Sequence, residues 1–142
     1  MATSNLLRVV LDTNAVLSSV SRRSPYRAIL TKLFDGKYEL FITNDILLEY
    51  EEKISQNFDP DTAELNIGAI LLLPNVVKIE THYRLKLIYP DLDDNKFADC
   101  AFAANAHFLV TNDRDFRILK SLQFPKFNVV RIEEFLKVVE SL

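Results

Sequence analysis

Short runs of apolar and β-branched residues alternate with longer segments of helical periodicity along this chain of 142 residues. Such short runs indicate buried strands, and apolar residues spaced three and four apart indicate helices that pack against them. Helices between successive strands are typical of crossover connections, which keep the strands mainly parallel. We expect strands at residues 7–11, 38–43, 76–79, 108–110 and 128–131. The alternation therefore predicts an α/β fold around a mainly parallel central sheet.

The size and composition of the chain favour one domain. A chain of this length can bury one hydrophobic core and is short for two ordinary domains, so we expect residues 1–142 to form a single domain. Hydrophobic residues make up 49% of the chain and charged residues 26%, which is typical of soluble globular proteins. The one cysteine, Cys100, excludes an intrachain disulfide and favours a cytoplasmic location. We expect neither a signal peptide nor a membrane span, because no apolar segment has the required length.

Two of the expected strands end in the same polar chemistry. Asp12 directly follows strand 7–11, and Thr111 and Asp113 follow strand 108–110. The carboxyl ends of parallel strands lie along one edge of the sheet, where ligands bind. Asp12 alone suits a helix cap equally well, but the recurrence at Asp113 favours a shared site. We therefore expect Asp12 and Asp113 to face each other across one site.

Two further groups of acids require an explanation. Glu49 stands beside the apolar stripe of a helix, where it must either lie at the solvent edge or meet a cation, because burying an unpaired charge costs free energy. Residues 91–95 form the densest acidic cluster. That cluster fits a bound cation or, alternatively, an exposed loop and helix start, where carboxylates favour the positive end of the helix dipole. Asp93 or Asp94 opens this helix, and Asp99 lies on a different face of it from Asp94.

Carboxylates in this number favour a hard divalent cation over other kinds of site. Mg²⁺ and Mn²⁺ prefer oxygen ligands and water, and carboxylates around such ions can serve hydrolysis of phosphate esters. The chain has no glycine-rich phosphate loop, and its 2 histidines lie far apart, without cysteine partners for a structural zinc ion. The net charge of −3 is unusual for a nucleic-acid binder. Bound cations would offset it, and local basic residues would have to hold the phosphates.

The ordered set of motifs resembles the PIN-domain family. The matching segments are Val9-Val10-Leu11-Asp12-Thr13-Asn14, then Glu49, then Asp93-Asp94-Asn95-Lys96-Phe97, then Leu109-Val110-Thr111-Asn112-Asp113-Arg114-Asp115-Phe116. The similarity is greatest to the VapC-like toxins of bacterial and archaeal toxin–antitoxin systems. This resemblance implies a three-layer α/β/α sandwich and cleavage of RNA that depends on Mg²⁺ or Mn²⁺. It also implies an antitoxin protein as partner and a homodimer.

The resemblance also implies roles for individual residues. The catalytic acids would be Asp12, Glu49, Asp94 and Asp113, and the metal ligands among them Asp12, Asp94 and Asp113. Residues that orient these ligands through hydrogen bonds would be Asn14, Asp99, Thr111 and Asp115. Candidate contacts to RNA phosphates are Arg22, Arg23, Arg27, Lys96 and Arg114, although surface cations often only solvate a protein. Asn105 stands where the family often has a glycine, and asparagine tolerates the left-handed conformation that such a turn needs.

Two other functions are compatible with the same residues. A protein of this fold that has lost its activity would act through protein contacts alone. The same acids would also serve a metal-dependent DNA nuclease or phosphatase. Retention of all four acids favours the active nuclease over the inactive binding module.

Overall fold

Five parallel strands form the central sheet of the computed structural model, which describes residues 5–81, 95–122 and 126–142. The strands lie in the order β3-β2-β1-β4-β5. Register is set by pairs such as Arg8 with Glu39 and Val9 with Phe108. The bounds of the strands are β1 Arg8–Leu11, β2 Glu39–Ile42, β3 Val76–Lys78, β4 Phe108–Val110 and β5 Val129–Val130. All five expected strands are confirmed, each within two residues of its expected ends.

The chain changes direction across the sheet between β1 and β4. From β1 it adds β2 and β3 on one side, and β4 and β5 then follow on the other side of β1. The backbone N–H of Asp12 donates to the carbonyl of Val110 at 3.0 Å, so the two strands stay paired to their last residues. In open parallel sheets, ligands bind beyond the carboxyl ends of the strands at such a reversal. The topology therefore places a candidate site beside Asp12.

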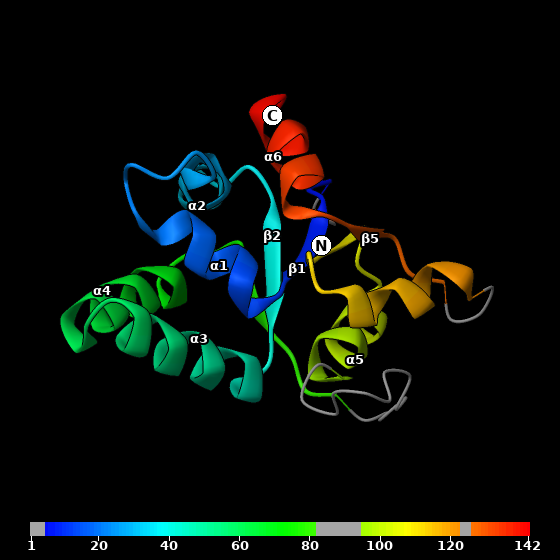
Figure 1. Cartoon of the computed structure of the whole chain (residues 1–142), viewed down its shortest axis with the longest axis horizontal. Helices are drawn as coiled ribbons and strands as arrows, with labels where there is room; N and C mark the ends of the chain where they lie inside the picture. The colour runs from blue at the N-terminus through cyan, green and yellow to red at the C-terminus, as the bar shows by residue number, and fades with distance from the viewer. Residues whose placement is uncertain (1–4, 82–94, 123–125) are drawn as a thin grey trace.

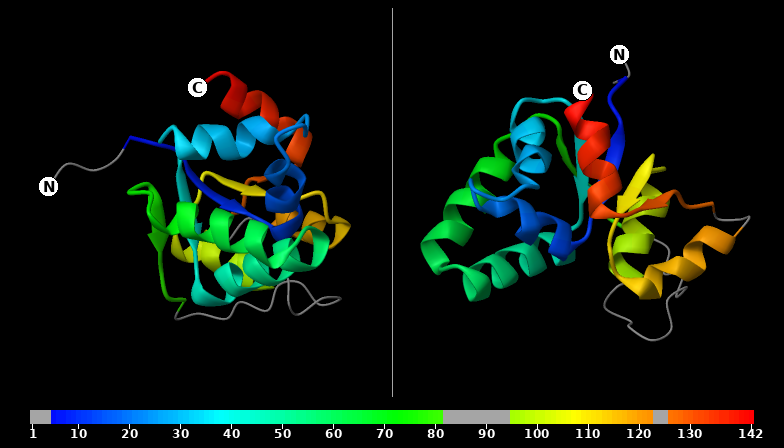
Figure 2. Two further views of the ribbon diagram at one scale, coloured as in Figure 1. Left: turned by 90° about the vertical axis from the view of Figure 1, so that its left-hand side faces the viewer. Right: turned by 45° about the horizontal axis from the view of Figure 1, so that its top comes forward.

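Helices cover both faces of the sheet (Figures 1 and 2). Helices α1 to α4 lie on one side, whereas α5 lies on the other and contacts β1, β2 and β4. The 3₁₀ helix η2 contacts β5, and α6 packs against α2. The bounds are α1 Thr13–Val20, α2 Arg27–Phe34, α3 Asn44–Asn57, α4 Pro60–Leu71, α5 Asn95–Ala103, η2 Arg114–Ser121 and α6 Ile132–Glu140. The expected three-layer α/β/α sandwich with a parallel sheet is confirmed.

Burial in the core explains the run of apolar residues in β1. Val9, Val10 and Leu11 of β1 are fully buried, as expected of a central parallel strand with helices on both faces. Tyr50 of α3 is also fully buried, and its hydroxyl donates to the carbonyl of Leu11. This bond satisfies the phenol and fixes α3 against the end of β1. Glu49, the neighbour of Tyr50, is thereby held near Asp12.

Two details of the chain follow from local chemistry. Asn105 has a φ of 50°, so it adopts the left-handed conformation that asparagine tolerates at a helix end. Cys100 is a buried free thiol, and burial raises its pKa to about 12. Within the described ranges, no helix is long and apolar enough to cross a membrane.

Candidate active site

Asp12 is held rigidly at the end of β1. Its side chain is 5% exposed, and Oδ1 accepts a hydrogen bond from the backbone N–H of Ala15 at 2.8 Å. Oδ2 accepts a hydrogen bond from the hydroxyl of Thr111. Asp12 therefore caps α1 and also joins the end of β1 to the end of β4. The cap and the shared site, which the sequence left as alternatives, are compatible with each other.

The surroundings of Asp12 oppose its ionisation. Burial raises the pKa of the Asp12 carboxyl to about 6, and the hydrogen bonds from Thr111 and Ala15 only partly counter this effect. The carboxylates of Asp113 and Glu49 raise the pKa further. These three acids thus act on one another electrostatically, as expected of groups that share a site. A cation placed among them would relieve both the repulsion and the cost of burial.

Glu49 lies half-buried on α3 and has partners for both carboxylate oxygens. Oε2 accepts a hydrogen bond from the hydroxyl of Thr13, the first residue of α1. Oε1 lies 2.7 Å from Nζ of Lys96 on α5. Of the two alternatives that the sequence offered for Glu49, the structure shows contact with a cation, and that cation is a lysine of the same chain.

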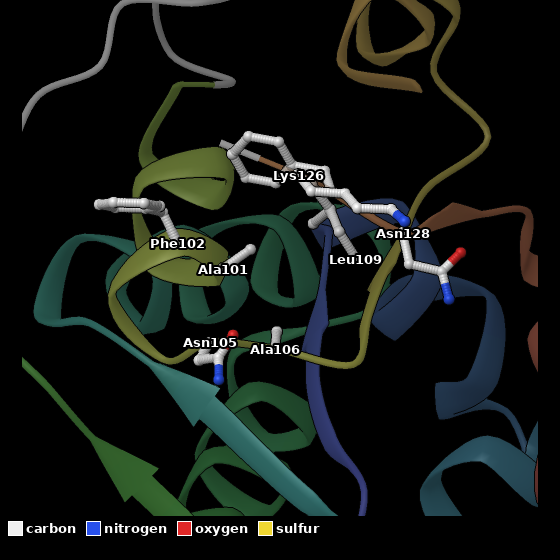
Figure 3. Close-up of a pocket in the computed structure, with 8 residues that line it drawn as sticks. Ala101, Phe102, Asn105, Ala106, Leu109, Lys126 and Asn128 are labelled. Atoms are coloured by element: carbon white, nitrogen blue, oxygen red, sulfur yellow. The ribbon is translucent and has the colours of Figure 1, made fainter. Parts of the chain in front are cut away.

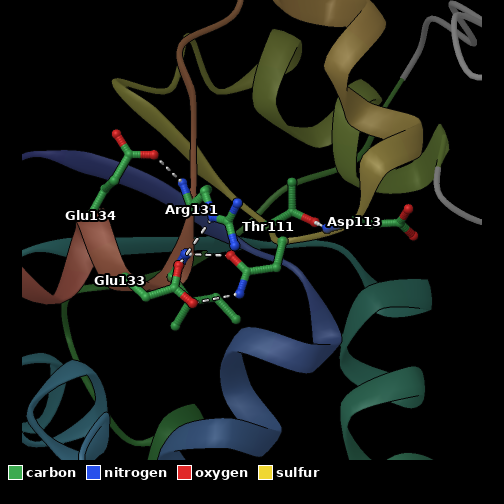
Figure 4. A network of polar contacts seen from close by, with 7 residues as sticks. Thr111, Asp113, Arg131, Glu133 and Glu134 are labelled. Atoms are coloured by element: carbon green, nitrogen blue, oxygen red, sulfur yellow. Dashed lines mark hydrogen bonds and ion pairs between the residues drawn. The ribbon is translucent and has the colours of Figure 1, made fainter.

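Thr111 connects Asp12 to Asp113. The Thr111 hydroxyl donates to Asp12 and accepts a hydrogen bond from the backbone N–H of Asp113 at 3.0 Å. Asp113 caps η2, because its Oδ1 accepts from the backbone N–H of Asp115 at 2.9 Å. In Figure 4 Asp113 points away from the polar cluster of Arg131, Glu133 and Glu134. The side chain of Asp113 is therefore free of ion pairing with that cluster.

The polar cluster in Figure 4 holds the end of β4 against the start of α6. The side-chain nitrogen of Asn112 donates to Glu133 at 3.0 Å, and its oxygen accepts from the backbone N–H of Ile132 at 2.8 Å. These bonds fix the loop that carries Thr111 and Asp113. Asn112 thus supports the site, a role that the sequence did not indicate.

The residues predicted to orient the ligands differ in their surroundings. Thr111 contacts Asp12 as the prediction requires. Asn14 is exposed on α1, and its neighbour Thr13 contacts Glu49. Asp99 is 7% exposed on α5, next to Cys100. Asp115 lies in the first turn of η2.

The site fits a hard cation by the chemistry of its donors. Asp12 and Asp113 offer carboxylate oxygens, the ligands that Mg²⁺ and Mn²⁺ prefer. Asp94, the third predicted ligand, lies outside the described residues. Within residues 5–81, 95–122 and 126–142, no three acidic, histidine or cysteine side chains gather closely enough to hold a metal ion by themselves. Asp12, Asp113 and Asp94 as a metal-binding set therefore remain a prediction.

Comparison with known proteins identifies the fold family. The sequence profile described as the PIN domain matches residues 8–115, which include every described acid of the site, with Asp115 as the last matched residue. The chain belongs to the PIN domain family. The expected family is therefore confirmed, whereas no curated protein matches the chain in sequence.

Solved structures share the fold of this PIN domain at low sequence identity. VapBC2 from Rickettsia felis, bound to a DNA fragment from its promoter, is 17% identical with a TM-score of 0.58 and covers 88% of this chain and 98% of its own. PAE2754 from Pyrobaculum aerophilum is 15% identical with a TM-score of 0.63 over 99% and 100%. VapC20 from Mycobacterium tuberculosis, a toxin that cleaves the sarcin–ricin loop, is 13% identical with a TM-score of 0.55 over 76% and 92%. At these identities the similarity establishes the fold alone.

The predicted RNA contacts occupy different parts of the PIN domain. Arg22 and Arg23 are exposed beyond the end of α1, whose eight residues separate them from Asp12 by about 12 Å. Arg27 donates to the carbonyl of Val20 at 2.8 Å and lies over the ring of Phe34, so it stabilises the junction of α1 and α2. Lys96 pairs with Glu49. Arg114 is exposed directly after Asp113.

Sequence reasoning missed a row of cations that starts at Arg114. Arg114, Arg117 and Lys120 are all exposed on η2, while Phe116 and Leu119 are buried on its other side. A 3₁₀ helix has three residues per turn, so side chains three apart align on one face. We call Arg114, Arg117 and Lys120 the basic ridge. Their spacing is visible in the sequence, but it has meaning only once the helix is known to be 3₁₀.

A cavity elsewhere in the PIN domain is separate from this site (Figure 3). It has a volume of about 360 Å³ and lies between α5 and the segment that leads into β5. Asn105 and Ala106, which line it, come just before β4, and Asn128, which also lines it, comes just before β5. It therefore lies toward the amino ends of β4 and β5, opposite the edge that carries Asp12 and Asp113.

Proposed function

We propose that this PIN domain is a metal-dependent endoribonuclease and the toxin of a toxin–antitoxin pair. The observation that carries the proposal is Asp12, a buried carboxylate at the reversal of strand order, bonded to Thr111 and repelled by Glu49 and Asp113. This arrangement is suited to a cation and lies where parallel sheets bind their ligands. The fold shared with VapC20 and VapBC2 supports a nuclease toxin.

In the proposed mechanism Asp12, Asp94 and Asp113 would hold Mg²⁺ or Mn²⁺. The bound ion would lower the pKa of a water molecule and stabilise negative charge on the phosphate that is cleaved. Thr111 orients Asp12 by donating to one of its oxygens, and Ala15 holds the other oxygen through its backbone N–H. Asp99, Asp115 and Asn14 would orient the ligands through hydrogen bonds.

The buried acid favours an active enzyme over an inactive binding module. A protein that acts through surface contacts alone needs only a cap for α1 at this position, and asparagine would provide one without a buried carboxylate whose pKa is raised to about 6. Such a group lowers the stability of the fold at neutral pH, and costs of this kind are concentrated at functional sites. The energetics of Asp12 thus support catalysis.

The basic ridge supports a polyanionic substrate. Arg114 adjoins Asp113, and six residues of 3₁₀ helix carry the ridge about 12 Å away from the site to Lys120. Exposed cations in a row contact nucleic-acid phosphates and so offset the acidity of the rest of the chain. Arg22 and Arg23 would contact more distant parts of the same RNA. A small phosphoester would reach none of these cations except Arg114.

We further propose an antitoxin protein as the partner, a homodimer as the assembly and the cytoplasm as the location. The antitoxin is supported by the shared fold with VapBC2. The dimer and the location rest on the family resemblance. Each of the three is accessible to co-purification, sedimentation and cell fractionation.

The test of the proposed function is cleavage by purified protein of single-stranded RNA, DNA and a small phosphoester, each with Mg²⁺, with Mn²⁺ and with EDTA. We expect metal-dependent cleavage of RNA. The variant Asp12→Asn should cleave RNA at least about 100-fold more slowly, because the carboxylate that would hold the metal ion is lost. Asp35→Asn, an exposed acid in the turn after α2, is the matched control and should cleave at the wild-type rate. Full activity of Asp12→Asn would contradict the proposal, and a preference for DNA or the phosphoester would support the alternative enzymes.

A further inference from the structure

The ion pair between Glu49 and Lys96 joins two helices at the edge of the candidate site. Glu49 comes from α3 and Lys96 from the first turn of α5, and 2.7 Å separates Oε1 from Nζ. Their side chains are only 22% and 21% exposed. The other ion pair of the described residues, Arg131 with Glu133, is about half exposed and involves none of the acids of the site. An ion pair shielded to this degree is screened less by salt than a surface pair.

We propose that Lys96 is the built-in counter-cation of Glu49, so that the site binds one divalent ion and the lysine ammonium takes the place of a second. This inference rests on the proposed function, because it assumes that Asp12 and Asp113 hold a metal ion. It assigns Lys96 a role inside the site in place of a contact to RNA. It also explains why Glu49 is not among the predicted metal ligands, and makes it the anchor of Lys96.

Both carboxylate oxygens of Glu49 already have partners within the protein. One carboxylate oxygen accepts from the Thr13 hydroxyl, and the other faces the Lys96 ammonium. To bind a divalent ion, Glu49 would have to give up at least part of this contact. The ammonium of Lys96 would then lie beside a second ion of the same sign, and removing one partner of a shielded pair is costly.

The positions of both partners are restrained by their helices. Tyr50, next to Glu49, is bonded to the carbonyl of Leu11, which fixes α3 at the end of β1. Nζ of Lys96 lies 5.4 Å from the centre of the Phe97 ring, a favourable position for a cation. Neither partner is a freely moving surface side chain. The ammonium is therefore held at the site and is not free to move through the solvent.

The charges of the site agree with this role. Asp12, Glu49 and Asp113 carry three negative charges when ionised, and Lys96 neutralises that of Glu49. Glu49 therefore needs no metal ion as a counter-charge, which leaves the divalent ion to Asp12, Asp113 and the predicted ligand Asp94.

Titration of the metal-free full-length protein with Mn²⁺ tests this inference. We expect isothermal titration to give one ion for each chain of wild type and two for Lys96→Met, because Glu49 is then released as a ligand. The double variant Lys96→Met, Glu49→Gln should return to one. Lys96→Arg, which keeps the charge, should bind one ion. Lys53→Met is the matched control, since Lys53 lies one turn from Glu49 on the same helix, and it should also bind one ion.

The outcomes separate the inference from the proposed function. Absence of Mn²⁺ binding to wild type would contradict the metal centre and with it the proposed function. One ion on both wild type and Lys96→Met would overturn the inference and leave the proposed function intact. Two ions on wild type would overturn the inference as well, because Lys96 would then not replace the second ion. If Lys96→Met does not fold, as circular dichroism would show, Lys96→Gln provides the same comparison, and the wild-type count still decides.

Discussion

Asp12 concentrates the conflict between folding and function in a single residue. Its carboxyl caps α1 and bonds to Thr111, and both contacts stabilise the fold. Its burial beside Glu49 and Asp113 has the opposite effect, because the ionised form is disfavoured there. A metal ion would resolve the conflict by supplying the missing positive charge. Without such an ion, the ionisation of Asp12 should be measurable as a loss of stability.

The metal-free protein should therefore become less stable as pH rises from about 4 to about 6. The folded state retains the Asp12 proton up to a pKa of about 6, whereas the unfolded chain releases it near the ordinary value of 3.8. Between these values the folded state holds more protons, so stability falls with increasing pH. The contribution amounts to about 3 kcal/mol once pH exceeds both values.

Asp12→Asn should remove this dependence and stabilise the metal-free protein by up to about 3 kcal/mol at pH 8, less the weakening of the cap. Urea unfolding in EDTA at pH 4.5, 6 and 8 measures the difference between variant and wild type. The difference should grow between the first two values and then level off. The exposed control Asp35→Asn should show no such growth. A difference that stays constant with pH would contradict the position of Asp12 in a buried acidic site.

At the scale of elements, the apolar runs of the sequence predicted the strands and the strand ends that carry the acids. Buried parallel strands are continuous apolar runs, so β1 and β4 were recognisable, and the acids after them were expected to meet. The strand-end rule thus placed Asp12, Thr111 and Asp113 correctly beside one another. Glu49 entered through the family resemblance, because its position on α3 says nothing by itself about which strand it approaches.

Contacts between side chains of different helices were not predictable in the same way. Thr13, Glu49 and Lys96 come from α1, α3 and α5, and their meeting depends on how those helices pack on the sheet. Sequence patterns determine which face of each helix is buried but not its rotation to within one residue. The contact of Thr13 with Glu49 was therefore not predicted. The 3₁₀ form of η2 was equally hidden, and the basic ridge with it.

The basic ridge should account for about two units of the salt dependence of RNA binding. Each phosphate contact to a single strand contributes about 0.7 to the slope of log K against log salt, and the ridge has three cations. Replacing Arg114, Arg117 and Lys120 with glutamine should lower the slope by that amount. Fluorescence anisotropy with a labelled single-stranded RNA in EDTA measures binding without cleavage.

A triple variant of Lys37, Lys78 and Lys137 to glutamine is the control for the loss of total charge. These lysines are exposed and lie outside η2, so the slope should change little. An equal fall in both triple variants would mean that net charge, and not the ridge, determines binding. An unchanged slope in the ridge variant would remove η2 from the RNA-binding surface.

At the scale of the molecule, charge is distributed unevenly over an acidic protein. The net charge of −3 argued against nucleic-acid binding when the sequence was considered as a whole. The structure instead places three cations in one row beside Asp113, and a bound metal ion would offset the acids of the site. Local charge thus decides what the molecule can bind, as expected when the Debye length is about 8 Å at physiological salt.

Both the proposed nuclease activity and the role of Lys96 require Asp12 and Asp113 to bind a metal ion at the reversal of strand order. Crystals soaked in Mn²⁺ and measured at the manganese absorption edge test this requirement directly. We expect one anomalous peak, from an ion that lies within about 2.3 Å of a carboxylate oxygen of Asp12 or Asp113 or that binds them through one water molecule. Lys96 should remain paired with Glu49 in the same crystals. Crystals without a peak at this edge of the sheet, under millimolar Mn²⁺ and with Asp12 ionised, would contradict metal binding by Asp12 and Asp113.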